Sequence, residues 1–338
     1  MYTVRISGTD QSFSCAPDDT LLRAALRSGV GFPYECNVGS CGNCKFELIE
    51  GSLANQWPEA PGLSDKDRTR NRALGCQSCP TSDVQIKLRP SDHYRPVHVP
   101  LRTCARLVAT RAITHDLSEF RVELTQPMAF APGQYALLQL PGVTGVRAYS
   151  MSNYDGAATT ALEFQVRRVP QGVGSAALFD QLKPGDNVQI DGPYGMAYLR
   201  DQAARDILCI AGGSGLAPMV SIARGAFVTP ALQTRKLHFV YGARAPQDLC
   251  GQGMVSVLPG WAQRGSYHAA ISGLEVSQAL PADALRGYVH EVVDQLYGAQ
   301  LPSMEVYFAG PPLMAQALLK LLVERKVPME QVHFDQFY

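Results

Sequence analysis

The chain has 338 residues, more than one ordinary hydrophobic core needs, so its length suggests two or three domains. A hydrophobic fraction of 46% and a charged fraction of 18% are typical of a globular protein and exclude a disordered or low-complexity chain. Lysine plus arginine and aspartate plus glutamate both number 30, so no overall charge attracts nucleic acid or an acidic membrane surface.

The N-terminal part predicts a small α+β domain of the β-grasp kind, in which a hairpin and a helix precede a cysteine-rich loop and a closing strand. The expected elements are strands at 2–7, 11–15, 45–50 and 84–88, a helix from Leu21 to Gly29 and a capped turn at Ser64. We assign residues 1–89 to this domain. Residues 90–100 contain prolines and no hydrophobic periodicity, which is typical of an extended linker.

Three cysteines are crowded into the loop at residues 35–44, and a fourth follows further along the chain. Cys36, Cys41 and Cys44 have the spacing C-x4-C-x2-C, and together with Cys76 they match the plant-type pattern for a [2Fe–2S] cluster. Nine cysteines without a visible export signal favour a reducing compartment, the cytoplasm, where clustered thiols bind metal rather than form disulfides. The sequence therefore predicts an iron–sulfur cluster.

The glycines of this loop support the same prediction, while three alternatives remain open, one of which is a set of inert buried cysteines without a metal. A loop that wraps inorganic sulfide must bring backbone N–H groups close to negative charge, which Gly39 and Gly42 permit through positive φ and the lack of a Cβ. A zinc site is one alternative, but zinc ligands usually come as two short cysteine pairs. Cys79 is an alternative to Cys76 as the fourth ligand, and we prefer Cys76.

Residues 101–203 predict an antiparallel β-barrel, because Pro-Gly turns separate short alternating runs at the spacing of a barrel. Two motifs suggest cofactor binding: Arg147, Tyr149 and Ser150 in R-x-Y-S, and Gly172, Val173, Gly174 and Ser175 after a basic strand that contains Arg167. An arginine can clamp a pyrophosphate, an aromatic ring can line a planar group and a hydroxyl can donate to a ring nitrogen. The plainer alternative is a strand with an exposed arginine.

In residues 204–338 apolar strands alternate with helical segments, which predicts a doubly wound parallel α/β domain that binds a nucleotide. The expected binding residues follow two strands: Gly212, Gly213, Gly215 and Pro218 after one, and Gly310 and Pro311 after another. A glycine turn between a strand and a helix lets the backbone approach a diphosphate. The first loop is not the G-x-G-x-x-G of a dehydrogenase, so it does not match the standard dinucleotide fingerprint.

These motifs together resemble the reductase components of bacterial aromatic-ring and alkene monooxygenases, of the toluene and xylene monooxygenase type. The resemblance rests on FPYECNVGSCGNCKFELIEG, R-x-Y-S, GGSGLAP, YGAR, AGPP and the C-terminal FDQFY, and it covers essentially the whole chain. It implies a plant-type ferredoxin fused to a ferredoxin–NADP reductase-like module that holds FAD and binds NADH. The expected activity is an NADH-dependent oxidoreductase, in which hydride passes to the flavin and single electrons pass to the [2Fe–2S] cluster.

The resemblance also implies roles for the residues of the first two domains. The cluster ligands would be Cys36, Cys41, Cys44 and Cys76. At the flavin, Arg147 matches the residue on the pyrophosphate, Tyr149 the residue against the ring and Ser150 the hydroxyl near N5. Residues 172–175 match a second pyrophosphate loop.

In the third domain, the loop that contains Gly212, Gly213, Gly215 and Pro218 matches the nicotinamide-cofactor loop of the family. The chain ends in an acid-x-aromatic sequence, so Phe337, or alternatively Tyr338, is expected to stack on the flavin where nicotinamide enters. One departure from the family is Ala309, where related reductases commonly have a cysteine close to the nicotinamide. NADH is expected on family grounds, although Arg244 could instead favour the 2′-phosphate of NADPH.

The resemblance also implies a separate protein that accepts the electrons. The acceptor is expected to be a Rieske-type ferredoxin or a diiron oxygenase component that docks transiently at the cluster loop, around residues 38–43. Two alternatives are a reductase of a Rieske ring-hydroxylating dioxygenase and a non-enzymatic iron–sulfur redox sensor. We expect neither nucleic acid nor a membrane as a partner.

Overall fold

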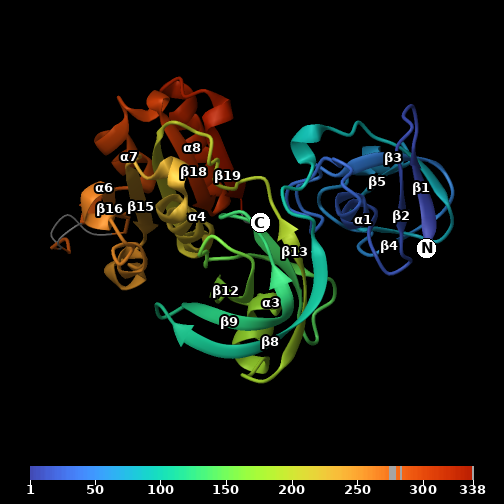
Figure 1. Ribbon diagram of the computed structural model, residues 1–338, viewed down its shortest axis with the longest axis horizontal. Helices are drawn as coiled ribbons and strands as arrows, with labels where there is room; N and C mark the ends of the chain where they lie inside the picture. The colour runs from blue at the N-terminus through green and yellow to red at the C-terminus, as the bar shows by residue number, and fades with distance from the viewer. Residues whose placement is uncertain (274–278, 282–283, 337–338) are drawn as a thin grey trace. The chain divides into compact units, whose positions relative to one another are not determined.

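The computed structural model describes residues 1–273, 279–281 and 284–336 (Figure 1). Phe337 and Tyr338, the two residues expected to stack on the flavin, lie outside the described residues. The chain folds into two compact units. The first contains residues 1–103, 136–148 and 189–196, and the second contains residues 104–135, 149–188 and 197–338. None of the helices in the described ranges combines the length and the apolar character that a bilayer span requires.

The N-terminal α+β fold is built on a five-stranded mixed sheet with the strand order β2-β1-β7-β3-β5. Its strands are β1 (Tyr2–Ile6), β2 (Ser12–Cys15), β3 (Lys45–Glu50), β5 (Arg72–Leu74) and β7 (Val84–Lys87), beside a separate pair formed by β4 (Leu53–Asn55) and β6 (Ser78–Pro80). Helix α1 (Leu21–Arg27) begins at Thr20, whose hydroxyl accepts a hydrogen bond from the Arg23 N–H. Helix α2 (Asp65–Arg68) begins with a capping box at Ser64. Strand alternation and helix capping predicted β1, β2, β3, β7, α1 and the cap at Ser64, whereas the short strands β4, β5 and β6 were not predicted.

Residues 90–100, which precede strand β8 (Leu101–Ala112), contain local structure. The Ser91 N–H donates to the Gly31 carbonyl at 2.9 Å, and a 3-10 turn follows at Asp92–Tyr94. The ring of Tyr94 lies 6.3 Å from that of Tyr34, centroid to centroid. A Cβ on Gly31 would lie 2.0 Å from the Ser91 carbonyl oxygen, so only glycine permits this close approach. The segment therefore packs beside the residues that lead into the cysteine loop.

The middle of the chain forms a six-stranded sheet with the order β11-β10-β13-β8-β9-β12. Its strands are β8 (Leu101–Ala112), β9 (Leu117–Met128), β10 (Tyr135–Gln139), β11 (Arg147–Ser150), β12 (Thr159–Arg167) and β13 (Asn187–Tyr194). Antiparallel pairing joins β8 to β9 and β9 to β12. Met151, just after β11, pairs with Phe164 of β12, so the first and last strands of this order are also neighbours. The sheet therefore curls into the predicted barrel.

The C-terminal part forms a six-stranded parallel sheet with the order β17-β16-β15-β14-β18-β19 (Figure 1). The strands are β14 (Asp206–Gly212), β15 (Leu237–Ala243), β16 (Gly265–Ile271), β17 (Ala284–Arg286), β18 (Met304–Gly310) and β19 (Val332–Gln336), and the helices are α4 (Leu216–Val228), α5 (Gln252–Val255), α6 (Trp261–Arg264), α7 (Val289–Tyr297) and α8 (Pro312–Glu324).

Helices cover both faces of this parallel sheet. Successive residues of β14 point to opposite faces, so Cys209 packs into the core that contains α4, whereas Ile210 packs into the core that contains α7 and α8. The doubly wound arrangement predicted from the sequence is thus confirmed. Since β14 and β18 are parallel neighbours, the loops that follow them lie at the same edge of the sheet, where such folds bind ligands.

Candidate electron-transfer sites

The four predicted cluster ligands lie in two pairs. Cys36 and Cys41 form the first pair, in which the Cys41 N–H donates to the Cys36 sulfur at 3.3 Å. The Cys44 thiol donates to the Cys76 sulfur at 3.3 Å, and both of these side chains are buried. A [2Fe–2S] cluster takes two protein ligands at each of its two irons, and the two pairs of thiols match that requirement.

The cysteine loop directs hydrogen-bond donors at the sulfur atoms. The pKa of the Cys36 thiol is lowered to about 5, because the Cys41 side chain and backbone N–H groups of the loop donate to its sulfur. The Asn43 N–H donates to the Cys41 sulfur at 3.5 Å. Next to Cys36, the buried Nδ2 of Asn37 has no hydrogen-bond partner among the described residues. Donors of this kind stabilise negative charge, so the loop fits an anionic iron–sulfur cluster.

The two glycines of the loop have the positive φ that the sequence predicted, 92° at Gly39 and 78° at Gly42. A Cβ on Gly42 would lie 2.6 Å from the Gly62 carbonyl oxygen, and a Cβ on Gly39 would lie 3.0 Å from the Trp57 ring. The Gly62 N–H donates to the Gly39 carbonyl at 2.9 Å. Backbone conformation and close packing therefore both require glycine at these positions.

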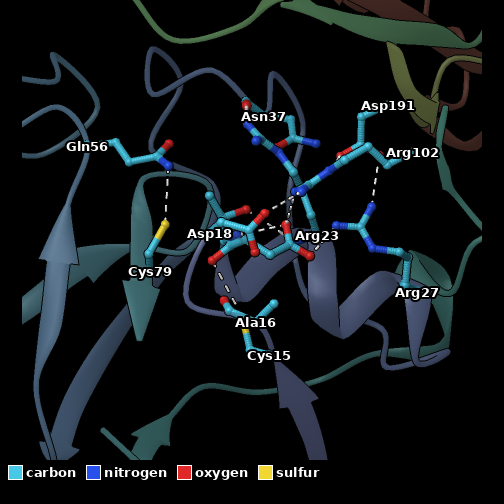
Figure 2. A network of polar contacts seen from close by, with 12 residues as sticks. Cys15, Ala16, Asp18, Arg23, Arg27, Asn37, Gln56, Cys79, Arg102 and Asp191 are labelled. Atoms are coloured by element: carbon cyan, nitrogen blue, oxygen red, sulfur yellow. Dashed lines mark hydrogen bonds and ion pairs between the residues drawn. The ribbon is translucent and has the colours of Figure 1, made fainter. Parts of the chain in front are cut away.

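Cys79, the alternative fourth ligand, has a different partner (Figure 2). Its sulfur accepts a hydrogen bond from Nε2 of Gln56 at 3.2 Å, and burial raises the pKa of its thiol. Cys76 lies instead against Cys44, with 3.3 Å between the two sulfur atoms. The geometry favours Cys76 over Cys79 as a ligand beside Cys44.

The R-x-Y-S residues lie on β11, and Gly172–Ser175 lead into the short helix α3 (Val173–Ala176). The Arg147 guanidinium donates to two backbone carbonyls of its own loop and forms no ion pair within the described residues. Ser150 is a buried residue whose hydroxyl makes no hydrogen bond in the described part of the chain. Both residues thus keep donors for a pyrophosphate and a ring nitrogen, which fits a flavin nucleotide. Ser175 instead accepts from the Val169 N–H at 3.1 Å and stabilises the turn.

A cavity of about 150 Å³ lies at the carboxyl edge of the parallel sheet. It brings together four predicted cofactor residues: Arg167 of β12, Gly212 and Gly213 after β14, and Pro311 after β18. An ion pair of 2.6 Å between Nε of Arg167 and Oδ2 of Asp116 holds the arginine in place. A guanidinium beside a glycine turn can bind a diphosphate, so the cavity fits a nicotinamide nucleotide.

The two nucleotide loops also pack closely against each other. A Cβ on Gly215 would lie 2.0 Å from the Ala309 carbonyl oxygen, and a Cβ on Gly310 would lie 2.6 Å from the Met314 side chain. Pro218 is buried in α4. The loop glycines therefore have two roles. Gly212 and Gly213 line the cavity, whereas Gly215 and Gly310 permit close packing of the loops.

Asp116 and Tyr241 are among the residues of the cavity that were not predicted from the sequence. Asp116 lies in the turn between β8 and β9, 51 residues from Arg167, and an isolated aspartate gives no local signal for such a pair. Tyr241 donates from its hydroxyl to the Gly213 carbonyl at 3.4 Å, and its place at the start of the YGAR motif could have identified it. Arg244, which the sequence raised as a possible 2′-phosphate ligand, also lines the cavity.

Family models match three consecutive parts of the chain. The model of the 2Fe-2S iron-sulfur cluster binding domain matches residues 4–81, that of the oxidoreductase FAD-binding domain residues 104–198, and that of the oxidoreductase NAD-binding domain residues 209–320. These matches confirm the predicted cofactors, a [2Fe–2S] cluster, FAD and NADH.

Several characterised proteins are similar to the chain over nearly its full length. A ferredoxin–NAD(P)+ reductase, CarAd, of Metapseudomonas resinovorans is 39% identical, with 100% of both chains covered. The ferredoxin–NAD+ reductase component of the alkene monooxygenase system of Xanthobacter autotrophicus is 39% identical, with 97% of this chain and 98% of the relative covered. The xylene/toluene monooxygenase electron transfer component XylA of Pseudomonas putida is 34% identical, over 99% and 93%.

A solved structure of the ferredoxin reductase in carbazole 1,9a-dioxygenase superposes with a TM-score of 0.89, at 36% identity, over 100% of this chain and 98% of that one. The predicted fold and the predicted resemblance to oxygenase reductases are therefore both confirmed. The chain belongs to the family of NADH-dependent ferredoxin–NAD(P)+ reductases, in which a [2Fe–2S] domain, an FAD-binding domain and an NAD-binding domain form one electron-transfer protein.

Proposed function

We propose that the chain is the reductase component of an aromatic-hydrocarbon oxygenase system and passes electrons from NADH to a separate protein. A monooxygenase system is the first candidate, supported by the monooxygenase relatives that match almost the whole chain. A dioxygenase system is the second, supported by the similarity to the carbazole 1,9a-dioxygenase reductase. The observation that carries the proposal is the cavity where Arg167 meets both nucleotide loops, in the same chain as two pairs of cysteines.

The bound groups supply hydride transfer from nicotinamide to flavin and one-electron transfer at the cluster. The chain's own residues bind and orient them. Cys36 with Cys41, and Cys44 with Cys76, would hold the cluster, and the backbone N–H groups of the loop would stabilise its charge. Because Cys44 and Cys76 are buried while Cys41 is half-buried, the first pair lies nearer the surface where an acceptor can approach.

The flavin would be held by the R-x-Y-S residues. The free donors of Arg147 would bind the pyrophosphate, Tyr149 would line the ring and the Ser150 hydroxyl would orient it by donating to a ring nitrogen. The backbone of Gly172–Ser175 would add N–H groups to the pyrophosphate. Phe337, with Tyr338 as the alternative, would cover the ring where nicotinamide enters, a role that rests on the C-terminal motif alone.

The nicotinamide nucleotide would occupy the cavity of the parallel sheet. Arg167, fixed by Asp116, would bind its diphosphate, and the small residues Gly212 and Gly213 would let the backbone come close to it. Gly215 and Gly310 would act by letting the two loops pack in contact. Pro311 would line the cavity, and Pro218 would act from helix α4, in which it is buried. Ala309 leaves the reacting ring without a neighbouring thiol on this loop.

The electron acceptor would dock at residues 38–43, and we propose a Rieske-type ferredoxin or a diiron oxygenase component as that acceptor. Asn43 is exposed in this loop, and Trp57, which packs on Gly39, is 42% exposed. Tryptophan often anchors protein interfaces, and a small contact suits a partner that must leave after each electron.

The nine cysteines form no disulfide in the structure, which supports a cytoplasmic location.

The purified protein is expected to absorb visible light through both a flavin and a [2Fe–2S] cluster, and NADH is expected to bleach both sets of bands. Bleaching of both is expected because the chain would hold the two redox groups that NADH can reduce. Anaerobic spectra before and after NADH addition measure this. Two stable chromophores that NADH leaves unbleached would contradict a reductase and favour a redox sensor.

Rates of electron transfer to a Rieske-type ferredoxin and to an oxygenase component, compared side by side, identify the acceptor.

Arg244→Leu is expected to lower kcat/KM for NADPH by about tenfold, because a phosphate loses a charge-assisted hydrogen bond, while kcat/KM for NADH stays within about twofold. Steady-state rates with ferricyanide as acceptor give both constants. Arg244→Lys, which keeps the charge, serves as the matched control and should retain most of the activity with NADPH. An equal loss with both nucleotides would show that Arg244 binds a part that they share.

A further inference from the structure

Arg23 of helix α1 is a buried arginine beside the cysteine loop (Figure 2). It is 5% exposed, and its guanidinium donates twice to Asn37: from Nε to Oδ1 at 3.2 Å and from NH2 to the carbonyl oxygen at 3.3 Å. Asn37 directly follows Cys36, is itself buried and has a left-handed φ of 55°. The arginine therefore fixes the residue next to the first predicted cluster ligand.

Arg23 forms no ion pair with any carboxylate in the ranges that the structure describes. The buried aspartates nearby pair with other arginines: Asp19 with Arg27 and Arg102, and Asp191 with Arg27 at 2.8 Å (Figure 2). A buried charge without a counterion is costly, because it loses its hydration and gains nothing in return. The counter-charge of Arg23 is therefore to be sought in a group that the protein binds.

The same turn of α1 contacts the chain beside the second pair of cysteines. The Leu22 N–H donates to the Gly75 carbonyl at 3.0 Å, and Gly75 directly precedes Cys76. A Cβ on Gly75 would lie 3.3 Å from Cβ of Leu22, so the two backbones approach closely. Arg23 thus lies on the helical turn that touches the residues next to both pairs.

The side-chain amide of Asn37 adds a second, independent observation. Arg23 occupies its Oδ1, which fixes the orientation of the amide and leaves Nδ2 as the donor that has no partner among the described residues. An unsatisfied buried donor is unusual in a folded protein. Its position next to Cys36 makes a cluster sulfur atom the natural acceptor.

We propose that Arg23, together with Asn37, supplies the buried positive charge that balances the [2Fe–2S] cluster and raises its reduction potential. The inference rests on the cluster site described under Proposed function and adds a positioning and tuning residue to it. The one-electron reduction makes the cluster more negative, so a fixed positive charge and a hydrogen-bond donor beside it favour the reduced form.

Redox titration of the full-length protein with both cofactors bound, followed by the EPR signal of the reduced cluster, tests this proposal. In Arg23→Gln the ratio of reduced to oxidised cluster at a fixed potential is expected to fall about tenfold or more, a negative shift of about 59 mV or more. Arg23→Lys keeps the charge and should stay within about threefold of the wild-type ratio. The control is Arg68→Gln, which removes a half-buried arginine paired with Asp65 and should leave the potential unchanged.

A wild-type potential in Arg23→Gln, with iron content intact, would overturn the proposal, as would equal shifts in Arg23→Gln and Arg23→Lys, since the charge would then not matter. Should Arg23→Gln fail to hold a cluster, Asn37→Asp keeps the test open, because a negative charge beside Cys36 must lower the potential. An unchanged potential in Asn37→Asp would again overturn it. Bleaching of the wild-type spectrum by NADH reports on the proposed function independently of these results.

Discussion

Cys76→Ala is expected to lose the [2Fe–2S] cluster, whereas Cys79→Ala is expected to keep it. The sulfur of Cys76 lies 3.3 Å from that of Cys44, while Cys79 is engaged with Gln56 at 3.2 Å. The rate of cytochrome c reduction should fall by more than about 100-fold. The loss of a residue that only hydrogen bonds to a metal ligand costs up to about 100-fold, and the loss of the ligand itself should cost more. Iron content and the visible spectrum of the purified variants measure the loss directly.

The same pair of variants separates the cluster from the flavin. Ferricyanide can take electrons from the flavin, so Cys76→Ala should still oxidise NADH with ferricyanide while it no longer reduces cytochrome c. Cys79→Ala, which deletes one buried thiol of similar size three residues away, controls for the effect of opening a small cavity. Retention of the cluster in Cys76→Ala and its loss in Cys79→Ala would assign the fourth ligand to Cys79.

Local sequence signals predicted the elements of the fold well. The strand at Lys45–Glu50 and the cap at Ser64 depend on alternation and capping, which act within a few residues, and both agree with the structure. The parallel sheet could be predicted because each of its strands is an apolar run followed by a helical segment. The positive φ of Gly39 and Gly42 followed from the chemistry that the cysteine spacing implied.

Contacts between residues far apart in the sequence could not be predicted in this way. Asp116 meets Arg167 only because β9 and β12 are neighbours in the folded sheet, and no spacing in the sequence encodes that pairing. The buried contact of Arg23 with Asn37 likewise depends on how α1 packs against the cysteine loop. The sequence identified four cysteines, but their division into two pairs is a property of the fold.

The largest effect on nucleotide binding is expected from Gly215→Ala. Gly215 has φ of −59°, which alanine adopts without strain, so the obstacle is contact alone. The new Cβ would lie 2.0 Å from the Ala309 carbonyl oxygen, and backbone atoms cannot move aside as a flexible side chain can. The two loops must separate, at a cost of about 1–3 kcal/mol in the free energy of unfolding. Because displacement by about 1 Å can cost about 100-fold, flavin reduction by NADH should slow by that order.

Two further glycines make a graded series with Gly215→Ala. In Gly212→Ala the Cβ would meet the sulfur of Met314 at 2.5 Å, the far part of a flexible side chain, so a smaller loss is expected. Gly253→Ala lies in α5 with nothing within 4 Å of the new Cβ and should behave as wild type. Stopped-flow bleaching of the flavin by NADH and thermal unfolding measure the series. Wild-type bleaching rates in Gly215→Ala would show that contact between the loops does not shape the nucleotide site. Slow bleaching in a variant that retains both FAD and the cluster would locate the damage at that site.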